Sequence, residues 1–285
     1  MSINQDTWII GVLGYPLTHS LSPLMHNSAL QHLGINAVYL PFAVGQDRFP
    51  QVIQAAGTLN IKGFNVTIPY KEHIIEQLDW VSESAKDCGA VNTVVIKNGI
   101  ASGYNTDGQG FILSLQQAGI EIGGLAVVLG AGGAARAIGF ELARRGCDTV
   151  FVNRTVSRAV TLAEHITRCT GKTSYGLSPQ DKSLKGLLGQ ANLLINTTPI
   201  GMFPDLTGIP EIDLELVNSE AVISDIVYNP ICTRLLAAAQ QQGFKTVDGL
   251  GMFINQGAVS FELFTGQKAP VEVMRSAVQK QVHNS

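Results

Sequence analysis

The sequence predicts an α/β protein with two domains: a mixed, mostly parallel α/β domain at the N-terminus, followed by a doubly wound nucleotide-binding domain. Three observations support this fold class. The chain has 285 residues, whereas a typical domain has roughly 100–200. Apolar strand-like runs alternate with helix-like segments, which is the pattern of parallel sheets. A glycine-rich hexapeptide directly follows one apolar run in the second half.

In the first half, continuous apolar runs predict strands and the segments between them predict helices. Ser22-Pro23 followed by Gly34 suggests a helix with Ser at its N-cap, Pro at its first position and Gly after its end. Asn98-Gly99 between two apolar runs predicts a β-hairpin. The expected strands are 8–13, 37–44, 61–68, 90–97 and 100–104, and the expected helices are 22–34, 46–56 and 69–78.

A second α/β unit begins after Asp107. A continuous apolar run at 125–129 predicts its first, buried strand. The later apolar runs are separated by segments long enough for crossover helices, as in doubly wound folds. The other expected strands are 149–152, 193–195, 221–227 and 244–247, and the expected helices are 108–118, 134–145, 157–168 and a helical tail from 249.

Composition and charge exclude several classes of protein. Apolar residues make up 45 % of the chain, charged residues make up 14 %, and the formal net charge is −3. This charge argues against a nucleic-acid partner, which requires clustered Lys and Arg. The four cysteines form no C-x-x-C pair and indicate thiols in a reducing compartment.

No targeting or membrane-spanning segment is expected. The N-terminus has no basic region followed by an apolar one, so we predict no signal peptide. The most apolar stretch, 125–143, is interrupted by glycines, Arg136 and Glu141, which argues against a membrane span. A cytoplasmic protein is therefore expected.

The hexapeptide Gly130-Ala131-Gly132-Gly133-Ala134-Ala135 matches G-x-G-x-x-A. It follows an apolar strand and opens a helix, which is the context that a Rossmann-like dinucleotide site requires. The first glycine permits the tight turn, the second lets a pyrophosphate approach the helix N-terminus, and the last alanine allows close helix–strand packing. The alternative is a tight turn that binds no ligand.

The residues after the next strand suggest NADP as the cofactor. NAD sites carry Asp or Glu about 20 residues after the glycines, whereas this chain has Asn153-Arg154-Thr155, with Arg158 one turn later. Guanidinium groups attract a 2′-phosphate and can hold it in a fork. Two solvated arginines are the alternative, although cations are disfavoured in the first turn of a helix.

Three segments of the first half are candidates for a substrate site. Ser20 and Ser22 lie at a helix N-terminus, where N–H groups favour an anion, unless Ser22 only caps the helix. Lys71 is expected in a first helical turn, where it opposes the macrodipole, unless it is a solvated surface lysine. Asp107, at the expected domain boundary, follows Asn105-Thr106 and could instead belong to a simple Asx turn and cap.

Taken together, these motifs resemble the shikimate dehydrogenase family in order and spacing, from Gly14 to about Gly266. Most of the segments that carry the resemblance end a predicted strand or begin a predicted helix. They are 14–27, 65–71, 89–93, 105–107, 130–135, 153–155, 196–202, 225–228 and 256–258.

The resemblance implies a substrate domain at 1–106, completed by C-terminal helices at 249–285, and an NADP domain at 107–248. It implies that Lys71 and Asp107 form the catalytic acid–base pair, without a metal. The implied substrate-binding residues are Ser20, Ser22, Thr67, Asn92, Asp107, Tyr228 and Gln256. The implied cofactor-binding residues are Gly130, Ala131, Gly132, Gly133, Ala134, Asn153, Arg154, Thr155, Arg158, Ile226 and Gly249.

The implied reaction is NADPH-dependent, reversible reduction of 3-dehydroshikimate to shikimate, by a monomer or homodimer with a small-molecule substrate. Three alternatives remain: a dual-specificity quinate/shikimate dehydrogenase, a tetrahydrofolate-type dehydrogenase that also pairs a lysine with a Rossmann domain, and a silent dinucleotide sensor. Ser20, Ser22 and Asp107 favour shikimate over folate. The presence of both Lys71 and Asp107 argues against a silent sensor.

Overall fold

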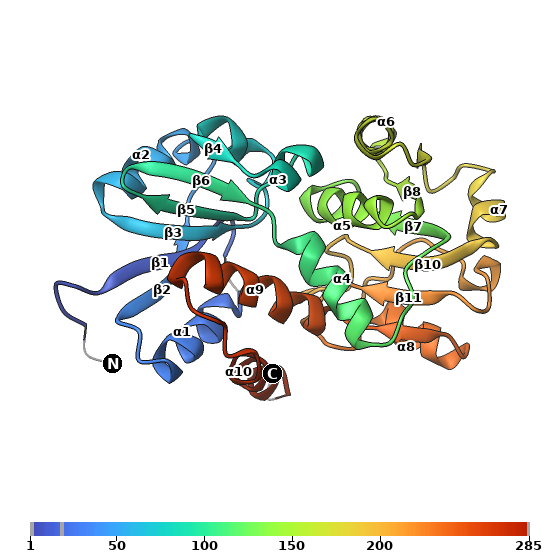
Figure 1. The fold of residues 1–285 in the computed structure, drawn as a ribbon. Helices are drawn as coiled ribbons and strands as arrows, with labels where there is room; N and C mark the ends of the chain where they lie inside the picture. The colour runs from blue at the N-terminus through green and yellow to red at the C-terminus, as the bar shows by residue number, and fades with distance from the viewer. Residues whose placement is uncertain (1–2, 18–19, 284–285) are drawn as a thin grey trace. The chain divides into compact units, whose positions relative to one another are not determined.

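A computed structural model describes residues 3–17 and 20–283 of the chain. The chain divides into two compact units, of which unit 1 comprises Met1–Thr106 and Ile254–Ser285 and unit 2 comprises Asp107–Phe253. Each unit is built on one six-stranded sheet with helices packed against it (Figure 1). The predicted α/β fold class with a mixed and a doubly wound part is confirmed.

The sheet of unit 1 is mixed and mostly parallel, as predicted. Its strand order is β2-β1-β3-β5-β6-β4, and only β5 runs antiparallel to its neighbours. The predicted hairpin joins β5 to β6 through Asn98 and Gly99, both with positive φ. The strands are β1 (Trp8–Gly14), β2 (Ala37–Ala43), β3 (Ile61–Val66), β4 (Trp80–Val81), β5 (Thr93–Lys97) and β6 (Ile100–Tyr104).

The helices of unit 1 differ from the prediction at three places, one of which is the unpredicted α3 (Glu83–Cys88). The helix expected at 46–56 is a 3₁₀ turn followed by a short α-helix, and the helix expected at 69–78 is a turn followed by a 3₁₀ helix. At the C-terminus, α10 packs against α1. The elements are α1 (Ser22–His32), η1 (Phe49–Gln51), α2 (Val52–Thr58), η2 (His73–Gln77), α3 (Glu83–Cys88), the end of α9 (Gly249–Thr265) and α10 (Val271–His283).

The sheet of unit 2 is entirely parallel, with the strand order β12-β11-β10-β7-β8-β9. Its central strand β7 has no polar side chain, because the sheet is covered on both faces. Ala126 and Val128 contribute to one buried cluster and Val127 and Leu129 to another. The strands are β7 (Leu125–Leu129), β8 (Asp148–Val152), β9 (Ser174–Leu177), β10 (Ala191–Asn196), β11 (Val222–Asp225) and β12 (Lys245–Val247).

Helices cover both faces of this sheet, which is the doubly wound arrangement that the sequence predicted. The short elements β9, α7, η3 and α8 were not predicted. The helices are α4 (Asp107–Gln117), α5 (Gly133–Arg144), α6 (Val156–Thr170), α7 (Leu184–Leu188), η3 (Leu214–Leu216) and α8 (Arg234–Gln241).

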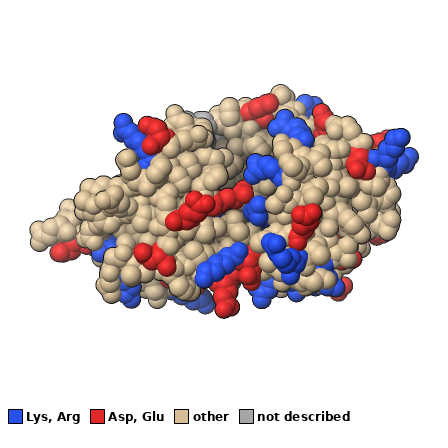
Figure 2. Space-filling view, turned by 90° about the horizontal axis from the view of Figure 1, so that it is seen from above, with Lys and Arg blue, Asp and Glu red and all other residues tan. Residues whose placement is uncertain are grey.

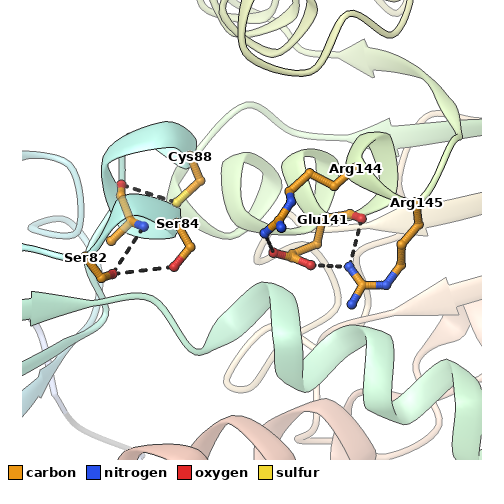
Figure 3. A network of polar contacts seen from close by, with 7 residues as sticks. Ser82, Ser84, Cys88, Glu141, Arg144 and Arg145 are labelled. Carbon is orange, nitrogen blue, oxygen red and sulfur yellow. Dashed lines mark hydrogen bonds and ion pairs between the residues drawn. The ribbon is translucent and has the colours of Figure 1, made fainter.

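Local polar contacts fix helix ends and surfaces in both units (Figure 3). In α3, the hydroxyl of Ser82 accepts a hydrogen bond from the N–H of Ala85, at 3.4 Å, and so caps the helix. On α5, Glu141 pairs with Arg144 at 3.4 Å and also with Arg145. These last contacts join residues three and four apart, which lie on one face of the helix.

Charged side chains of both signs are interspersed on the face that Figure 2 shows. All four cysteines are free thiols. Within residues 3–17 and 20–283, no helix combines the length and apolar character that a membrane span needs. The same residues contain no group of three or more His, Cys, Asp or Glu side chains arranged to hold a metal ion.

Candidate active site

The glycine loop joins β7 to α5 in unit 2. Gly130 has a φ of +113°, and an added Cβ would lie 2.6 Å from the hydroxyl oxygen of Thr197, so only glycine fits there. Gly132 is the N-cap of α5 and provides no side chain to cap it. A Cβ at Gly132 would meet no atom within 4 Å. The start of α5 therefore combines N–H groups that no side chain caps with open space on the Cβ side of Gly132, as a phosphate site requires.

The predicted 2′-phosphate site lies at the start of α6. Arg154 lies two residues before this helix and Arg158 in its first turn, which contains no acidic residue. Both arginine side chains are exposed. The side-chain amide of Asn153 donates to the carbonyl of Thr155, the N-cap residue of α6, at 2.9 Å.

Two loops at the carboxyl ends of β10 and β11 are held together by Asp225, which is completely buried. Its carboxylate accepts hydrogen bonds from Asn196 Nδ2 at 3.0 Å, from the N–H of Val227 at 3.0 Å and from the Thr233 hydroxyl at 2.8 Å. Burial raises the pKa of Asp225 above its ordinary value, against the lowering by these donors. Sequence reasoning did not identify this carboxylate as a link between the loops.

Asp225 thereby fixes the segment that contains Ile226, one of the predicted nicotinamide contacts. The N–H of Ile226 donates to the carbonyl of Asn196 at 3.1 Å. Gly249 packs so closely on this segment that an added Cβ would lie 2.4 Å from the carbonyl oxygens of both Ile226 and Val227. The two predicted backbone contacts, Ile226 and Gly249, are therefore neighbours. Tyr228 stacks on Phe253, with ring centroids 4.0 Å apart.

Asp107 is the first residue of α4, and its side chain is 4 % exposed. Within unit 2, α4 packs against α5, the helix that begins at the glycine loop. The residues before it are also fixed: Asn105 Nδ2 donates to the carbonyl of Ala90 at 2.9 Å, and Thr106 is 1 % exposed. Asp107 is thus a buried carboxyl group at the start of a helix that packs on α5.

Ser20 and Ser22 lie together at the beginning of α1. The N–H of Ser22 donates to the Ser20 hydroxyl at 3.3 Å, and Ser22 is 8 % exposed. The expectation that Ser22 is the N-cap is wrong, because Leu21 occupies that position and no side chain caps the helix. The preceding residues Thr18 and His19 lie outside the described part of the chain.

Lys71 does not lie in a helix, contrary to the prediction. It occupies a turn between β3 and η2, and its carbonyl accepts a hydrogen bond from the N–H of Val91 at 2.8 Å. The argument from an opposed helix dipole therefore fails. Thr67 lies four residues before Lys71 and opens the preceding turn, in which its carbonyl accepts from the N–H of Tyr70 at 2.9 Å. The side chains of Lys71 and Thr67 are partly exposed.

The side chains of Asn92 and Gln256 meet although 164 residues separate them, with Asn92 Nδ2 3.5 Å from Gln256 Oε1. Asn92 Oδ1 accepts from the N–H of Thr106 at 2.9 Å. Because a backbone N–H can only donate, this contact fixes which end of the Asn92 amide carries the donor. Asn92 is 2 % exposed and Gln256 is partly exposed.

Within unit 1 the structure thus pairs Ser20 with Ser22 and Asn92 with Gln256, and it places Thr67 and Lys71 in successive turns after β3. Within unit 2 it groups Ile226 with Gly249 and places the glycine loop and Arg154 after consecutive strands, β7 and β8. Sequence reasoning missed Ser260, which bonds to the carbonyl of Gln256 at 2.9 Å. Its spacing of one helical turn after Gln256 was the available signal.

Known proteins resemble this chain over its whole length. The substrate-binding domain of shikimate dehydrogenase matches residues 12–94, and the C-terminal domain of shikimate 5′-dehydrogenase matches residues 249–279. The shikimate dehydrogenase (NADP(+)) of Syntrophomonas wolfei is 43 % identical over 283 residues, which is 99 % of this chain and 98 % of that protein.

Solved structures give the same result. A shikimate dehydrogenase in complex with NADP+ has a TM-score of 0.91 at 40 % identity, covering 99 % of this chain and 98 % of that one. The quinate dehydrogenase of Corynebacterium glutamicum in complex with NAD has a TM-score of 0.86 at 31 % identity, covering 96 % and 99 %. From the match in sequence and in structure over nearly its full length, the chain belongs to the shikimate dehydrogenase family.

Proposed function

We propose that this protein catalyses the reversible, NADPH-dependent reduction of 3-dehydroshikimate to shikimate, a step of aromatic amino-acid biosynthesis. The observation that carries the proposal is the 43 % identity, over 99 % of the chain, to an NADP-dependent shikimate dehydrogenase. None of the relatives described above is a tetrahydrofolate-type dehydrogenase.

The geometry of unit 2 fits the cofactor. The uncapped N-terminus of α5, beside the open side of Gly132, suits the pyrophosphate. Arg154 and Arg158 suit the 2′-phosphate, and the backbone at Ile226 and Gly249 suits the nicotinamide. The remaining cofactor contacts that we propose are Ala131, Gly133, Ala134, Asn153 and Thr155.

The bound nicotinamide supplies or accepts the hydride, so the side chains have only to bind, orient and move a proton. Ser20 and Ser22 bind the carboxylate of the substrate, next to the uncapped start of α1. Thr67, Asn92 and Gln256 bind ring hydroxyls, and Tyr228 closes the site. Lys71 gives a proton to the ketone oxygen as negative charge develops there. Asp107 is the second member of the acid–base pair.

A second candidate is a dehydrogenase that also oxidises quinate, supported by the similarity to the quinate dehydrogenase. Quinate has a saturated ring and an added hydroxyl on the carbon that bears the carboxylate. That hydroxyl would compete for the space where Ser20 and Ser22 bind the carboxylate. We therefore favour an enzyme that is specific for shikimate over one that also oxidises quinate.

The test is the oxidation of NADPH, followed by absorbance, with and without 3-dehydroshikimate. We expect oxidation that depends on the substrate and is slower with NADH. The reverse reaction, with NADP+ and either shikimate or quinate, distinguishes the two candidates. If the folded protein binds NADPH but oxidises none in the presence of 3-dehydroshikimate, the proposed function is wrong.

A further inference from the structure

Ser260 lies in the part of α9 that belongs to unit 1, on the same helix as Gln256, and is completely buried. Its hydroxyl has four polar neighbours within hydrogen-bond distance. These are the carbonyl of Gln256 at 2.9 Å, Asn65 Nδ2 at 2.9 Å, Thr93 Oγ1 at 2.8 Å and Thr106 Oγ1 at 3.1 Å. A buried polar cluster of this kind is costly unless its members are satisfied, and it fixes their geometry when they are.

The direction of these hydrogen bonds follows from the groups that can only accept or only donate. Backbone carbonyls only accept. Ser260 therefore donates to the backbone carbonyl of Gln256, and Asn65 Nδ2 donates to the backbone carbonyl of Asn92 at 3.2 Å. Asn65 Nδ2 therefore also donates to Ser260. The other end of this amide, Asn65 Oδ1, accepts from the Tyr39 hydroxyl at 2.8 Å. Ser260 is thus both donor and acceptor at the centre of the cluster.

Both predicted substrate amides are attached to this cluster. Asn92 Oδ1 accepts from Thr93 Oγ1 at 2.9 Å, and Asn92 Nδ2 lies 2.9 Å from Thr106 Oγ1. A hydroxyl has one proton, and those of Thr93 and Ser260 go to Asn92 and Gln256. Thr106 Oγ1 accepts from Asn92 and donates its own proton to Ser260 at 3.1 Å, so Thr106 links Ser260 to Asn92. Gln256 is held twice, by its backbone carbonyl to Ser260 and by its side chain to Asn92.

We propose that Ser260 is a positioning residue: through Thr106 and the backbone of Gln256, it holds the Asn92 and Gln256 amides where they bind the substrate ring. The inference rests on the proposed function, since it assigns Ser260 to the same reaction. Ser260 moves no proton and has no part in cofactor binding. Its removal therefore weakens substrate binding and leaves the pH dependence of kcat and the KM for NADPH unchanged.

The central test is Ser260→Ala. The lost hydroxyl leaves the buried donor of Asn65 with fewer acceptors and releases the carbonyl of Gln256, for which we expect a rise of about 10-fold in the KM for 3-dehydroshikimate. Ser260→Thr keeps the hydroxyl and should restore the KM. Thr106→Val, which removes the hydroxyl between Ser260 and Asn92 while keeping the side-chain shape, should raise the KM in the same direction. It keeps the proposal falsifiable if Ser260→Ala fails to fold.

A matched control and a double mutant separate positioning from general stability. Ser114 is also a buried helical serine that bonds to a carbonyl one turn back, at Phe111, so Ser114→Ala should leave the KM for 3-dehydroshikimate unchanged. In a Gln256→Ala background, Ser260→Ala should add less than about threefold, because part of its effect acts through Gln256.

The wild-type reaction measured in the same series tests the proposed function separately. If the wild type is active and Ser260→Ala keeps a wild-type KM, the positioning role is overturned while the proposed function stands. Full additivity of Ser260→Ala and Gln256→Ala also overturns it. If the wild type does not reduce 3-dehydroshikimate, both proposals are wrong.

Discussion

His26 gives unit 1 a stability that depends on pH. It lies in α1, is completely buried, and stacks on Tyr39 with ring centroids 4.3 Å apart. Among the described residues, neither of its ring nitrogens has a hydrogen-bond partner. Burial without a partner for a charge lowers the pKa of His26 from 6.5 to about 3. The folded protein therefore keeps this ring neutral at pH values where the unfolded chain protonates it.

The direction of this pH effect follows from the linkage between proton binding and folding. Because the pKa of His26 is lower in the folded state, its contribution to stability is fully present above pH 6.5 and is lost as the pH falls towards 3. At pH 5 the unfolded chain binds nearly one more proton than the folded chain. Each pH unit below the unfolded pKa is worth about 1.4 kcal/mol, so the loss between pH 7 and pH 5 is about 2 kcal/mol.

We predict that His26→Phe removes this part of the pH dependence. The loss of unfolding free energy between pH 7 and pH 5 should be about 2 kcal/mol smaller in the variant than in the wild type. The comparison is made between two pH values within each protein, so any packing cost of the Phe ring cancels. Contributions from carboxylates are common to both proteins and cancel as well.

Urea unfolding followed by tryptophan fluorescence is the appropriate assay, because the chain has two tryptophans, Trp8 and Trp80, and both lie in unit 1 with His26. The matched control is His32→Phe, since His32 is the last residue of α1 and is exposed. Between pH 7 and pH 5, the control should lose as much unfolding free energy as the wild type. Equal losses in the wild type and in His26→Phe would refute the reasoning.

Three further predictions concern the reaction. Lys71→Ala should lower kcat by at least about 100-fold with an unchanged circular dichroism spectrum, as loss of a proton donor requires; a near-native kcat would exclude that role. The double variant Arg154→Ala, Arg158→Ala should raise the KM for NADPH, because each lost contact to the 2′-phosphate weakens the binding free energy by about 1.5–3 kcal/mol. The KM for NADH should change little. Arg168→Ala, an exposed arginine at the other end of α6, is the control, and wild type that uses NADH and NADPH equally would contradict the assignment. The kcat/KM for quinate should be about 10- to 100-fold below that for shikimate, and a ratio within threefold would favour the dual-substrate alternative.

The parts of the fold that the sequence predicted well are those with local causes. Strand β7 was predicted to the residue, because its apolar run is bounded by Gly124 and Gly130. The β5–β6 hairpin was predicted because Asn98 and Gly99 tolerate the positive φ that its turn requires. The short strand β4 and helix α3 were missed, because each has too few residues to show a period.

The helix expected at 69–78 failed for a reason that lies elsewhere in the chain. An α-helix needs the carbonyl of Lys71 to accept from the N–H four residues later. The N–H of Val91 takes that carbonyl instead, at 2.8 Å. Tyr70 is also anchored away from a helical path, since its hydroxyl donates to the carbonyl of Val44 and its ring stacks on Phe49 at 4.1 Å. No local signal predicts which distant N–H will compete.

The two halves of the candidate site also differ in whether local or distant contacts form them. The glycine loop is a single segment whose strand, turn and helix start can each be recognised locally, so the motif alone indicated a dinucleotide. The substrate side is assembled from segments as distant as Asn65 and Ser260, which meet at 2.9 Å across 195 residues. Residue types alone could not bring them together, and only the family resemblance placed Asn92 and Gln256 in one site. Ser260 shows what the structure adds, because it lies outside the motifs and yet contacts Gln256, which the resemblance assigns to the substrate site.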